Sequence, residues 1–267
     1  MPTTMVERSA VRASASRFRQ SLAMNGLDLV RIGRSLRTVV PFASERRRFR
    51  AQQRRSSGPF DAIQLLPVLS DRSEEAGSVG DQYFRQDLHV ARLVRDAAPD
   101  RHVDVGSRID GFIAHLLLFR SVEVLDVRPL HSDIEGLAFL QGDATTMDAF
   151  ADGSLPSLSS LHAVEHFGLG RYGDPIDADG SARAHASFER VLAPGGRLYL
   201  SVPVGRRRVE FNAHRVFDPS DPVDLLPGLA LERFDGIDDA GTFHAEVAPA
   251  ALADNEYGLG IYVFTKP

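Results

Sequence analysis

His102-Val-Asp-Val-Gly-Ser-Arg-Ile-Asp-Gly-Phe112 is a short apolar run that ends on a glycine and leads into a second apolar segment. A brief apolar run of this kind indicates a buried strand of a parallel sheet. The glycine lets the backbone approach a ligand, and a helix that begins after it offers unpaired N–H groups. This stretch therefore predicts a strand, a ligand-binding turn and a helix.

Outward from this stretch, short apolar runs alternate with helical patterns. Buried strands are expected at 102–106, 122–127, 138–141, 158–164 and 197–204, with last strands at 230–234 and 258–265. Helices are expected at 81–96, 111–119 and 182–192. Such alternation predicts an α/β fold: a Rossmann-like, doubly wound, mostly parallel seven-stranded sheet.

The first sixty residues differ from the rest in charge. They hold 13 arginines against three acidic residues, a net +10, which leaves −15 for the remainder of a chain whose net charge is −5. Apolar residues recur at three- and four-residue steps over 16–40, which indicates one or two amphipathic helices that Pro41 ends. We therefore expect a basic helical arm at 1–60, a connector and lead-in helix at 61–89, and the Rossmann domain at 90–267.

Composition narrows the functional classes. The absence of cysteine excludes disulfides, thiolate metal sites and a cysteine nucleophile. No run approaches the roughly 18 apolar residues of a membrane span, so a cytoplasmic protein is expected, with membrane association left open. The arm is expected to dock on the domain or on a second subunit, and a peripheral membrane contact is the alternative. No aromatic residues alternate with its arginines, so no specific nucleic acid partner is expected.

Acidic residues follow the second and third expected strands. Asp126 lies twenty residues beyond Gly106, the spacing at which a carboxylate accepts hydrogen bonds from both ribose hydroxyls of an adenosine ligand. Asp143 follows the third strand, where a carboxylate can accept a hydrogen bond from an adenine amino group. A cap or a solvated turn is the commoner role of each acid alone. Their order and spacing together favour an adenosine site.

The motif series Val-Asp-Val-Gly, Leu-Asp-Val, Gly-Asp-Ala and Leu-Ala-Pro-Gly-Gly-Arg-Leu resembles that of class I S-adenosylmethionine-dependent methyltransferases. The stretches 102–112, 160–177 and 210–216 also resemble a bacterial and nematode family known only as a domain of unknown function. Its bacterial members often occur beside polysaccharide-assembly genes. The resemblance covers most of residues 60–267.

The resemblance implies cofactor contacts after the first three strands: Asp104, Gly106 and Ser107 at the methionine end, Asp126 at the ribose and Asp143 at the adenine. The chain departs from the usual glycine loop because Arg108 and Asp110 stand where glycines are expected. We expect these two side chains to hold the carboxylate and ammonium of the cofactor by charge-assisted bonds.

Acceptor chemistry is expected in the loop after the fourth strand. His166 is the expected general base because an imidazole titrates near neutral pH. Three neighbours complete the expected catalytic set: Glu165, Arg171 and Asp174. Acceptor binding is expected from Tyr172, Arg206, Arg207 and His214. A divalent metal on His166, Asp174, Asp177 and His214 is possible by residue type but is not favoured, because the spacing is irregular.

These patterns predict an S-adenosylmethionine-dependent O-methyltransferase whose substrate is a small molecule or a glycan. The family context favours a sugar hydroxyl of a nucleotide sugar, oligosaccharide or lipid-linked glycan, and small-molecule and N-methyl acceptors are the alternatives. A non-catalytic binding module with a methyltransferase-like fold is the first alternative. A nicotinamide-dependent oxidoreductase is the second, although the Tyr-x-x-x-Lys pair of the short-chain type is impossible because the only lysine is Lys266.

Overall fold

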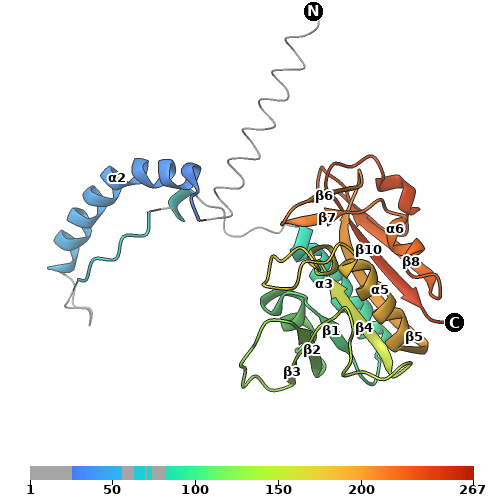
Figure 1. Cartoon of the computed structure of the whole chain (residues 1–267). Coiled ribbons are helices and arrows are strands. Elements are labelled where there is room, and N and C mark those ends of the chain that lie inside the picture. Colours follow the sequence, from blue (N-terminus) through green and yellow to red (C-terminus); the bar gives the residue numbers. More distant parts are fainter. Residues whose placement is uncertain (1–25, 56–62, 70, 74–81) are drawn as a thin grey trace, which may run out of the picture. The chain divides into compact units, whose positions relative to one another are not determined.

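A computed structural model describes residues 26–55, 63–69, 71–73 and 82–267 of the chain. The chain divides into two compact units, residues 1–78 and residues 79–267. The predicted lead-in helix is α3 (Gln82–Ala97), and it belongs to the second unit. The basic arm and most of the connector form the first unit (Figure 1).

The first unit is built on one long helix, α2 (Leu29–Gln53). The prediction that Pro41 ends this helix is wrong, because Pro41 lies inside it. Proline removes one backbone hydrogen bond, and the good helix formers that follow at 43–53 continue the helix. The expected helical residues 16–25 lie outside the described part of the chain. No helix among the described residues is long and apolar enough to cross a membrane.

The second unit contains a mostly parallel eight-stranded sheet in the order β3-β2-β1-β4-β5-β10-β8-β9. The strands are β1 (Val103–Val105), β2 (Val122–Asp126), β3 (Leu137–Gln141), β4 (Leu155–Leu161), β5 (Leu192–Val204), β8 (Ala230–Ile237), β9 (Phe243–His244) and β10 (Gly258–Thr265). β10 runs antiparallel to both of its neighbours. The predicted Rossmann-like fold is confirmed, and the two-residue strand β9 adds an eighth strand to the seven expected.

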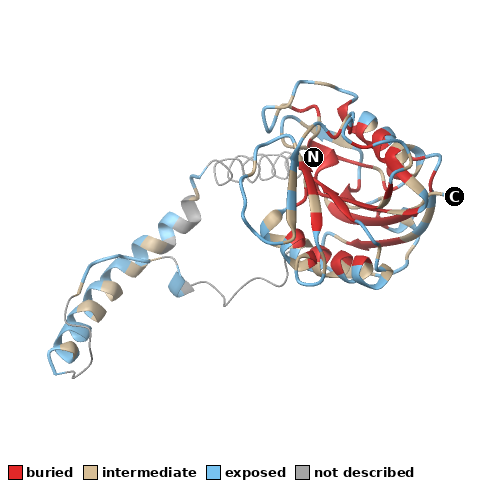
Figure 2. Cartoon of the chain, turned by 90° about the horizontal axis from the view of Figure 1, so that it is seen from below, coloured by how far each residue is buried: buried red, intermediate tan, exposed pale blue. Residues whose placement is uncertain are grey.

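Helices and turns cover the two faces of this sheet. They are η2 (Ile109–Ile113), α4 (Ala114–Leu116), η3 (Val164–His166), α5 (Gly180–Val191), α6 (Asp221–Asp224) and η4 (Pro249–Leu252). α3, η2 and α4 pack with one hydrophobic cluster, and α5 packs with the other. Buried residues therefore run along both sides of the sheet (Figure 2). A hairpin that the sequence did not predict, β6 (Arg208–Glu210) with β7 (His214–Val216), forms a separate two-stranded sheet.

The strand order places a ligand site beside β1. From β1 the sheet proceeds through β2 and β3 to one side, and through β4 and β5 to the other. Open parallel sheets bind ligands outside the carboxyl ends of their strands, at the point where the order reverses. The turns after β1, β2, β3 and β4 therefore meet at one edge.

Candidate functional site

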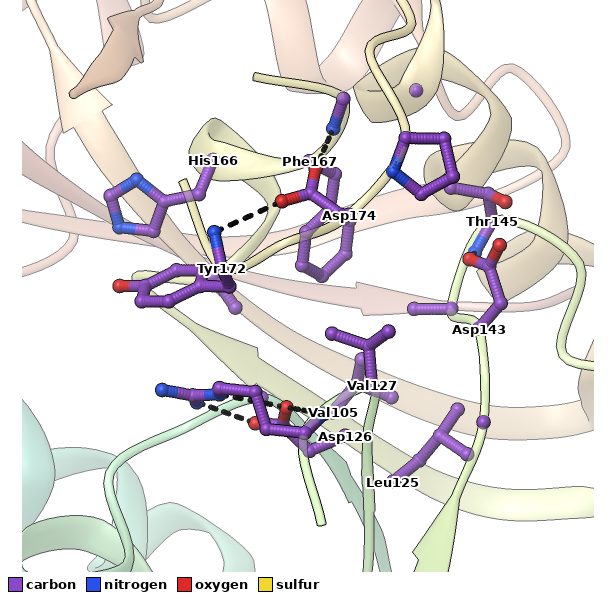
Figure 3. Close-up of a pocket in the computed structure, with 18 of the residues that line it drawn as sticks. Val105, Leu125, Asp126, Val127, Asp143, Thr145, His166, Phe167, Tyr172 and Asp174 are labelled. Atoms are coloured by element: carbon purple, nitrogen blue, oxygen red, sulfur yellow. Dashed lines mark hydrogen bonds and ion pairs between the residues drawn. The ribbon is translucent and has the colours of Figure 1, made fainter. Parts of the chain in front are cut away.

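A pocket of about 830 Å³, its open mouth included, lies at this edge of the sheet (Figure 3). Its lining comes from the turns after four strands and from the loop that leads to α5. The lining residues are Val105, Gly106, Leu125, Asp126, Val127, Arg128, Gly142, Asp143, Ala144, Thr145, His162, Ala163, His166, Phe167, Gly168, Tyr172, Asp174, Pro175, Asp177, Gly180 and Arg183. The pocket thus combines apolar walls with carboxylates, imidazoles and two arginines.

The turn after β1 approaches the pocket through its backbone. Gly106 has a φ of +70°, a conformation that side chains disfavour, and a Cβ there would come within 3.0 Å of the Ala163 Cβ. Its N–H donates to the carbonyl oxygen of Leu125 at 3.0 Å. Only a glycine therefore combines this backbone conformation with the close packing against the loop after β4.

Asp104 and Ser107 hold that turn from inside the protein. The Asp104 carboxylate accepts from the Ser107 N–H at 3.0 Å, the Ser107 hydroxyl at 2.6 Å and the Ser159 hydroxyl at 2.5 Å. Burial raises the pKa of Asp104 to about 6, although these hydrogen bonds oppose the shift. Neither Asp104 nor Ser107 is among the lining residues of the pocket, so the predicted cofactor contact of these side chains stays a prediction.

Arg108 and Asp110 pair with each other on the outside of the turn. The Arg108 Nε and an Asp110 carboxylate oxygen are 3.3 Å apart, and the guanidinium lies 5.7 Å from the centre of the Tyr83 ring. Neither residue is among those that line the pocket. Gly111 stands one residue after the position at which the usual loop has its last glycine. A side chain there would clash with the Asp87 carboxylate, which explains why the residue is glycine.

Asp126 lies in the pocket but already has a partner. Its Oδ1 accepts from the N–H and the Nε of Arg128 at 2.9 and 3.0 Å, and its Oδ2 accepts from Nη2 at 2.6 Å. The Arg128 guanidinium stacks over the Tyr172 ring at 4.4 Å. A ribose that binds Asp126 must therefore share or displace this guanidinium.

Asp143 stands on the far side of the pocket from Tyr172 (Figure 3). Its Oδ1 accepts from the Thr145 N–H at 2.7 Å, which shapes the turn after β3. The exposed carboxylate and the neighbouring Ala144 give this end of the pocket one polar and one apolar contact. Such a pair suits an adenine ring with its amino group.

The loop after β4 carries a buried cluster of two histidines and a carboxylate. The His162 Nδ1 lies 2.9 Å from the Glu165 Oε1, and the His166 Nε2 lies 3.6 Å from the same oxygen. Burial raises the pKa of Glu165, but the two histidines outweigh it and hold that pKa below its usual value. Among the described residues, the His162 Nε2 and the Glu165 Oε2 are buried without a hydrogen-bond partner.

His166 has a defined tautomer and faces the pocket. Its Nδ1 donates to the Ala213 carbonyl oxygen at 2.7 Å, a bond that leaves the lone pair of the neutral ring on Nε2. Arg171 Nη1 donates to the same carbonyl at 3.0 Å. Burial lowers the pKa of His166, Glu165 opposes this effect and Arg171 adds to it. Burial therefore favours the neutral ring, the form that can accept a proton.

Asp174 braces the same loop. Its Oδ2 accepts from the N–H groups of Gly168 and Gly170 at 2.8 and 3.3 Å, and its Oδ1 accepts from that of Tyr172 at 3.1 Å. Figure 3 shows the carboxylate between Phe167 and the Tyr172 backbone. These three bonds occupy both oxygens, so Asp174 positions the loop that carries Tyr172.

The predicted basic acceptor site lies elsewhere. Arg207 Nε donates to the Asp221 Oδ2 at 2.9 Å, and the His214 ring lies 5.0 Å from the Tyr257 ring. Arg206 is exposed. Arg206, Arg207 and His214 are all missing from the pocket lining, as are the expected catalytic residues Glu165 and Arg171. The last two nevertheless contact His166, and Tyr172 lies in the pocket.

The described residues contain no group of three or more His, Asp or Glu that could hold a metal ion. The metal alternative therefore has no ligand set in the described part of the chain. Sequence reasoning also missed pocket residues, namely Arg128, Thr145, Phe167 and Arg183. The signal for Arg128 was present, because an arginine two residues after a strand-end carboxylate reaches back to it.

One known family matches part of the sequence. Residues 141–233, about a third of the chain, match a family described as a Caenorhabditis protein of unknown function, DUF268. The stretches 160–177 and 210–216 lie inside the matched region, and 102–112 lies outside it. No curated protein matches the sequence significantly.

Solved structures resemble the second unit. The [4+2]-cyclase SpnF is 15% identical with a TM-score of 0.50, covering 71% of this chain and 85% of its own. A putative sarcosine dimethylglycine methyltransferase from Galdieria sulphuraria is 13% identical, also with a TM-score of 0.50, covering 68% of this chain and 85% of its own. Identities this low establish the fold alone. The chain therefore has the Rossmann-like methyltransferase fold.

Proposed function

We propose that this chain is an S-adenosylmethionine-dependent O-methyltransferase that acts on a sugar hydroxyl of a nucleotide sugar, oligosaccharide or lipid-linked glycan. One observation carries the proposal. A single pocket at the switch point of the sheet brings together Gly106, Asp126, Asp143 and the neutral imidazole of His166. The first three fit a nucleoside, and the fourth supplies a base beside it.

The pocket fits the adenosine part of the cofactor. Asp126 offers carboxylate oxygens for a ribose diol, and Asp143 offers one for the adenine amino group. Leu125 and Phe167 provide apolar walls for the ring system (Figure 3). The backbone of Gly106 lines the methionine end without a side chain. When bound, S-adenosylmethionine would supply an electrophilic methyl group on its sulfonium.

His166 would accept the proton of the acceptor hydroxyl at Nε2. The Nδ1–H bond to the Ala213 carbonyl holds the ring in the required tautomer. Glu165, 3.6 Å from Nε2, would stabilise the imidazolium that forms. Glu165 and Arg171 therefore act as positioning residues through His166.

The sugar acceptor rests on the resemblance of the loop that carries His166. That loop, 160–177, is the longest of the stretches that resemble the family of unknown function, and the resemblance implies a neighbourhood of polysaccharide-assembly genes for its bacterial members. A hydroxyl acceptor also suits this site, because an alcohol must lose its proton as the bond to the methyl carbon forms. A base with a lowered pKa is ready to receive that proton at neutral pH.

Thermal unfolding with S-adenosylmethionine, S-adenosylhomocysteine or NAD⁺ tests the cofactor. Ligand at about 100 times its dissociation constant should stabilise the protein by about 2.7 kcal/mol. We expect a shift with the first two and none with NAD⁺. Asp126→Ala should reduce it, whereas Asp133→Ala, an exposed acid outside the pocket lining, should not. No shift with either sulfur compound would refute the proposal.

Mass spectrometry of the surface glycan tests the acceptor. A strain that lacks the gene should lose a methyl group at one sugar position, and restoring the gene should return it. Restoring a His166→Gln form should not. An unchanged methyl pattern would remove the sugar acceptor from the proposal while leaving the cofactor site intact.

A non-catalytic binding module is the second candidate. The observation in its favour is that Arg128 already occupies both oxygens of Asp126. A module of this kind would bind neither sulfur compound, or would bind one without methyl transfer. Radiolabelled methyl transfer into a glycan fraction separates the two candidates.

A further inference from the structure

We propose that the first unit is a membrane-surface module and that α2 binds anionic lipid through one continuous stripe. The stripe consists of Leu36, Val40 and Ala43 followed by Arg47, Arg50 and Arg54. Successive members are three or four residues apart, so they share one face of the helix. Its first half is apolar and its second half is cationic.

The apolar half of the stripe is open to solvent. Leu36 is 67% exposed and Val40 is 77% exposed, far above what an apolar side chain in a packed core shows. Ile32 and Val39 flank them at 47% and 43% exposure. Side chains of this size, gathered on one face of a long helix, mark an interaction surface rather than scattered surface residues.

The described part of the connector bonds to another side of α2. The Thr38 hydroxyl donates to the Leu69 carbonyl oxygen at 2.8 Å, and Arg72 pairs with Glu45 at 2.5 Å. Thr38 and Glu45 lie on the face opposite Leu36 and Val40 by helical periodicity. The described part of the connector therefore braces the helix. Leu69 lines a hollow with Ile32, Leu36 and Val39, but Leu36 and Val40 stay largely exposed.

The cationic half decides the kind of partner. Arg47, Arg50 and Arg54 are exposed and prolong the apolar stripe along the same face. Two more exposed arginines, Arg48 and Arg55, lie beside them. A partner must therefore offer an apolar environment that buries the first half of the stripe and negative charges that pair with the second half. The boundary of an anionic bilayer offers both in one plane.

A second copy of α2 fits the stripe poorly. Parallel pairing would bring Arg47 against Arg47 and bury like charges. Antiparallel pairing would set Leu36 against arginine and bury unpaired guanidinium groups. A nucleic acid would neutralise the arginines but leave Leu36 and Val40 in water. Anionic lipid is the one of these partners that satisfies both halves.

Vesicle flotation with the full chain tests this proposal. Vesicles of three parts phosphatidylcholine to one part phosphatidylglycerol should bind at least about tenfold more protein than pure phosphatidylcholine. Binding should weaken as salt rises from about 0.1 to about 0.5 M, because salt screens the arginines. Equal binding to both vesicles, or none to the anionic ones, would overturn the proposal.

Variants locate the contact. Leu36→Asp with Val40→Asp should reduce anionic-vesicle binding by about tenfold or more, because it places charge in the apolar half. Arg47→Gln with Arg50→Gln should weaken binding and reduce its salt dependence. The matched control is Leu118→Asp, which changes an 86% exposed leucine of the second unit and should bind as the unchanged chain does. Unaltered binding by the double Asp variant would refute the assigned stripe.

Oligomeric state is the remaining readout. Light scattering should show the same mass for the unchanged chain and the double Asp variant. Loss of a dimer in that variant, without vesicle binding by the unchanged chain, would make a second copy the partner and overturn the lipid proposal. Thermal stabilisation by S-adenosylmethionine should be the same in both proteins, so this proposal and the proposed function fail separately.

Discussion

The turn after β1 and the loop after β4 border the same pocket, but they use polar residues in opposite ways. In the turn, the Asp104 carboxylate accepts hydrogen bonds from Ser107 and Ser159, and Arg108 pairs with Asp110. In the loop, His162 and Glu165 keep buried polar atoms without partners among the described residues. His162 also has a φ of +51°.

The difference separates residues whose polar groups fix the shape of the pocket from residues that keep polar groups free of partners within the described chain. Polar groups whose hydrogen bonds are all made by the chain stabilise the backbone geometry. Buried polar groups that lack a partner cost free energy, and such costs concentrate at functional sites. The turn after β1 therefore supplies shape, and the loop after β4 is the part to which the proposed function assigns the chemistry.

The largest expected effect concerns that chemistry. His166→Gln should lower methyl transfer by about 100-fold or more, because a general base contributes roughly 10² to 10⁴ in rate. The cofactor dissociation constant should change less than about twofold, since Gln keeps a similar volume. Radiolabelled transfer and calorimetry measure the two quantities. Full activity in this variant would remove the loop after β4 from the reaction.

The next effect concerns the stability of the turn. Asp104→Ala should lower the free energy of unfolding by about 3 kcal/mol, because three donors lose a buried acceptor. Asp110→Ala, which breaks an exposed pair, should cost less than about 0.5 kcal/mol. Urea denaturation measures both. Equal losses would contradict the inward role of Asp104.

The pH dependence of stability reports the same carboxyl group. The pKa of Asp104 is about 6 in the folded protein, raised by burial from an ordinary value of 3.8. Between these values the folded chain retains a proton that the unfolded chain has lost, so the contribution of Asp104 to stability falls as pH rises through this window. Asp104→Asn should remove that slope. If the urea midpoints of this variant and the unchanged chain differ equally at pH values of about 4 and about 6, the buried placement is contradicted.

A smaller effect is expected from the pair at the mouth of the pocket. Arg128→Met should raise affinity for S-adenosylmethionine by about threefold to tenfold, because it frees Asp126 for the ribose. Arg101→Met is the matched control, since Arg101 forms a similar two-bond pair with Glu123 away from the pocket. Calorimetry measures the dissociation constant of S-adenosylmethionine in both variants. A loss of affinity in Arg128→Met would show that the guanidinium itself contacts the cofactor.

The smallest effect is expected at the altered glycine loop. Arg108→Ala should lower cofactor affinity by about twofold to fivefold, because an exposed guanidinium that must first leave Asp110 contributes little net free energy. Arg92→Ala, which removes an exposed positive charge outside the pocket lining, controls for net charge. A loss of cofactor affinity above about 30-fold would mean that side chains of the turn after β1 bind the cofactor directly. The turn would then no longer differ from the loop after β4 in the use of its polar residues.

Local patterns predicted the frame of the fold well. Residues 258–265 were predicted as a strand and form β10 with the same bounds, because a long buried apolar run has few other solutions. The predicted helix 182–192 is α5, Gly180–Val191. The predicted helix at 111–119 is confirmed in part: a wide turn, η2, which an Ile113 N–H bond to the Arg108 carbonyl closes at 3.3 Å, leads into the short helix α4, Ala114–Leu116. Periodicity does not reveal such a turn.

The site was predicted less completely than the fold. Sequence spacing placed Asp126, Asp143 and His166 at one edge, and all three line the pocket. It did not reveal that Asp104 faces inward, because that depends on Ser159, a residue 55 positions away. Nor did it reveal that the Arg206–Arg208 cluster lies in and beside a hairpin, where Arg207 pairs with Asp221.

The Asp174 bracing has a consequence for how the pocket binds. Three backbone amides of the loop are fixed by one carboxylate before any ligand arrives. The entropy cost of ordering that segment is thus incurred during folding. Binding of a ligand does not have to order Tyr172 again. The loop is therefore ordered before a ligand binds. Exchanging residues 168–174 between relatives as one segment should transfer acceptor preference without changes to the strands of the sheet.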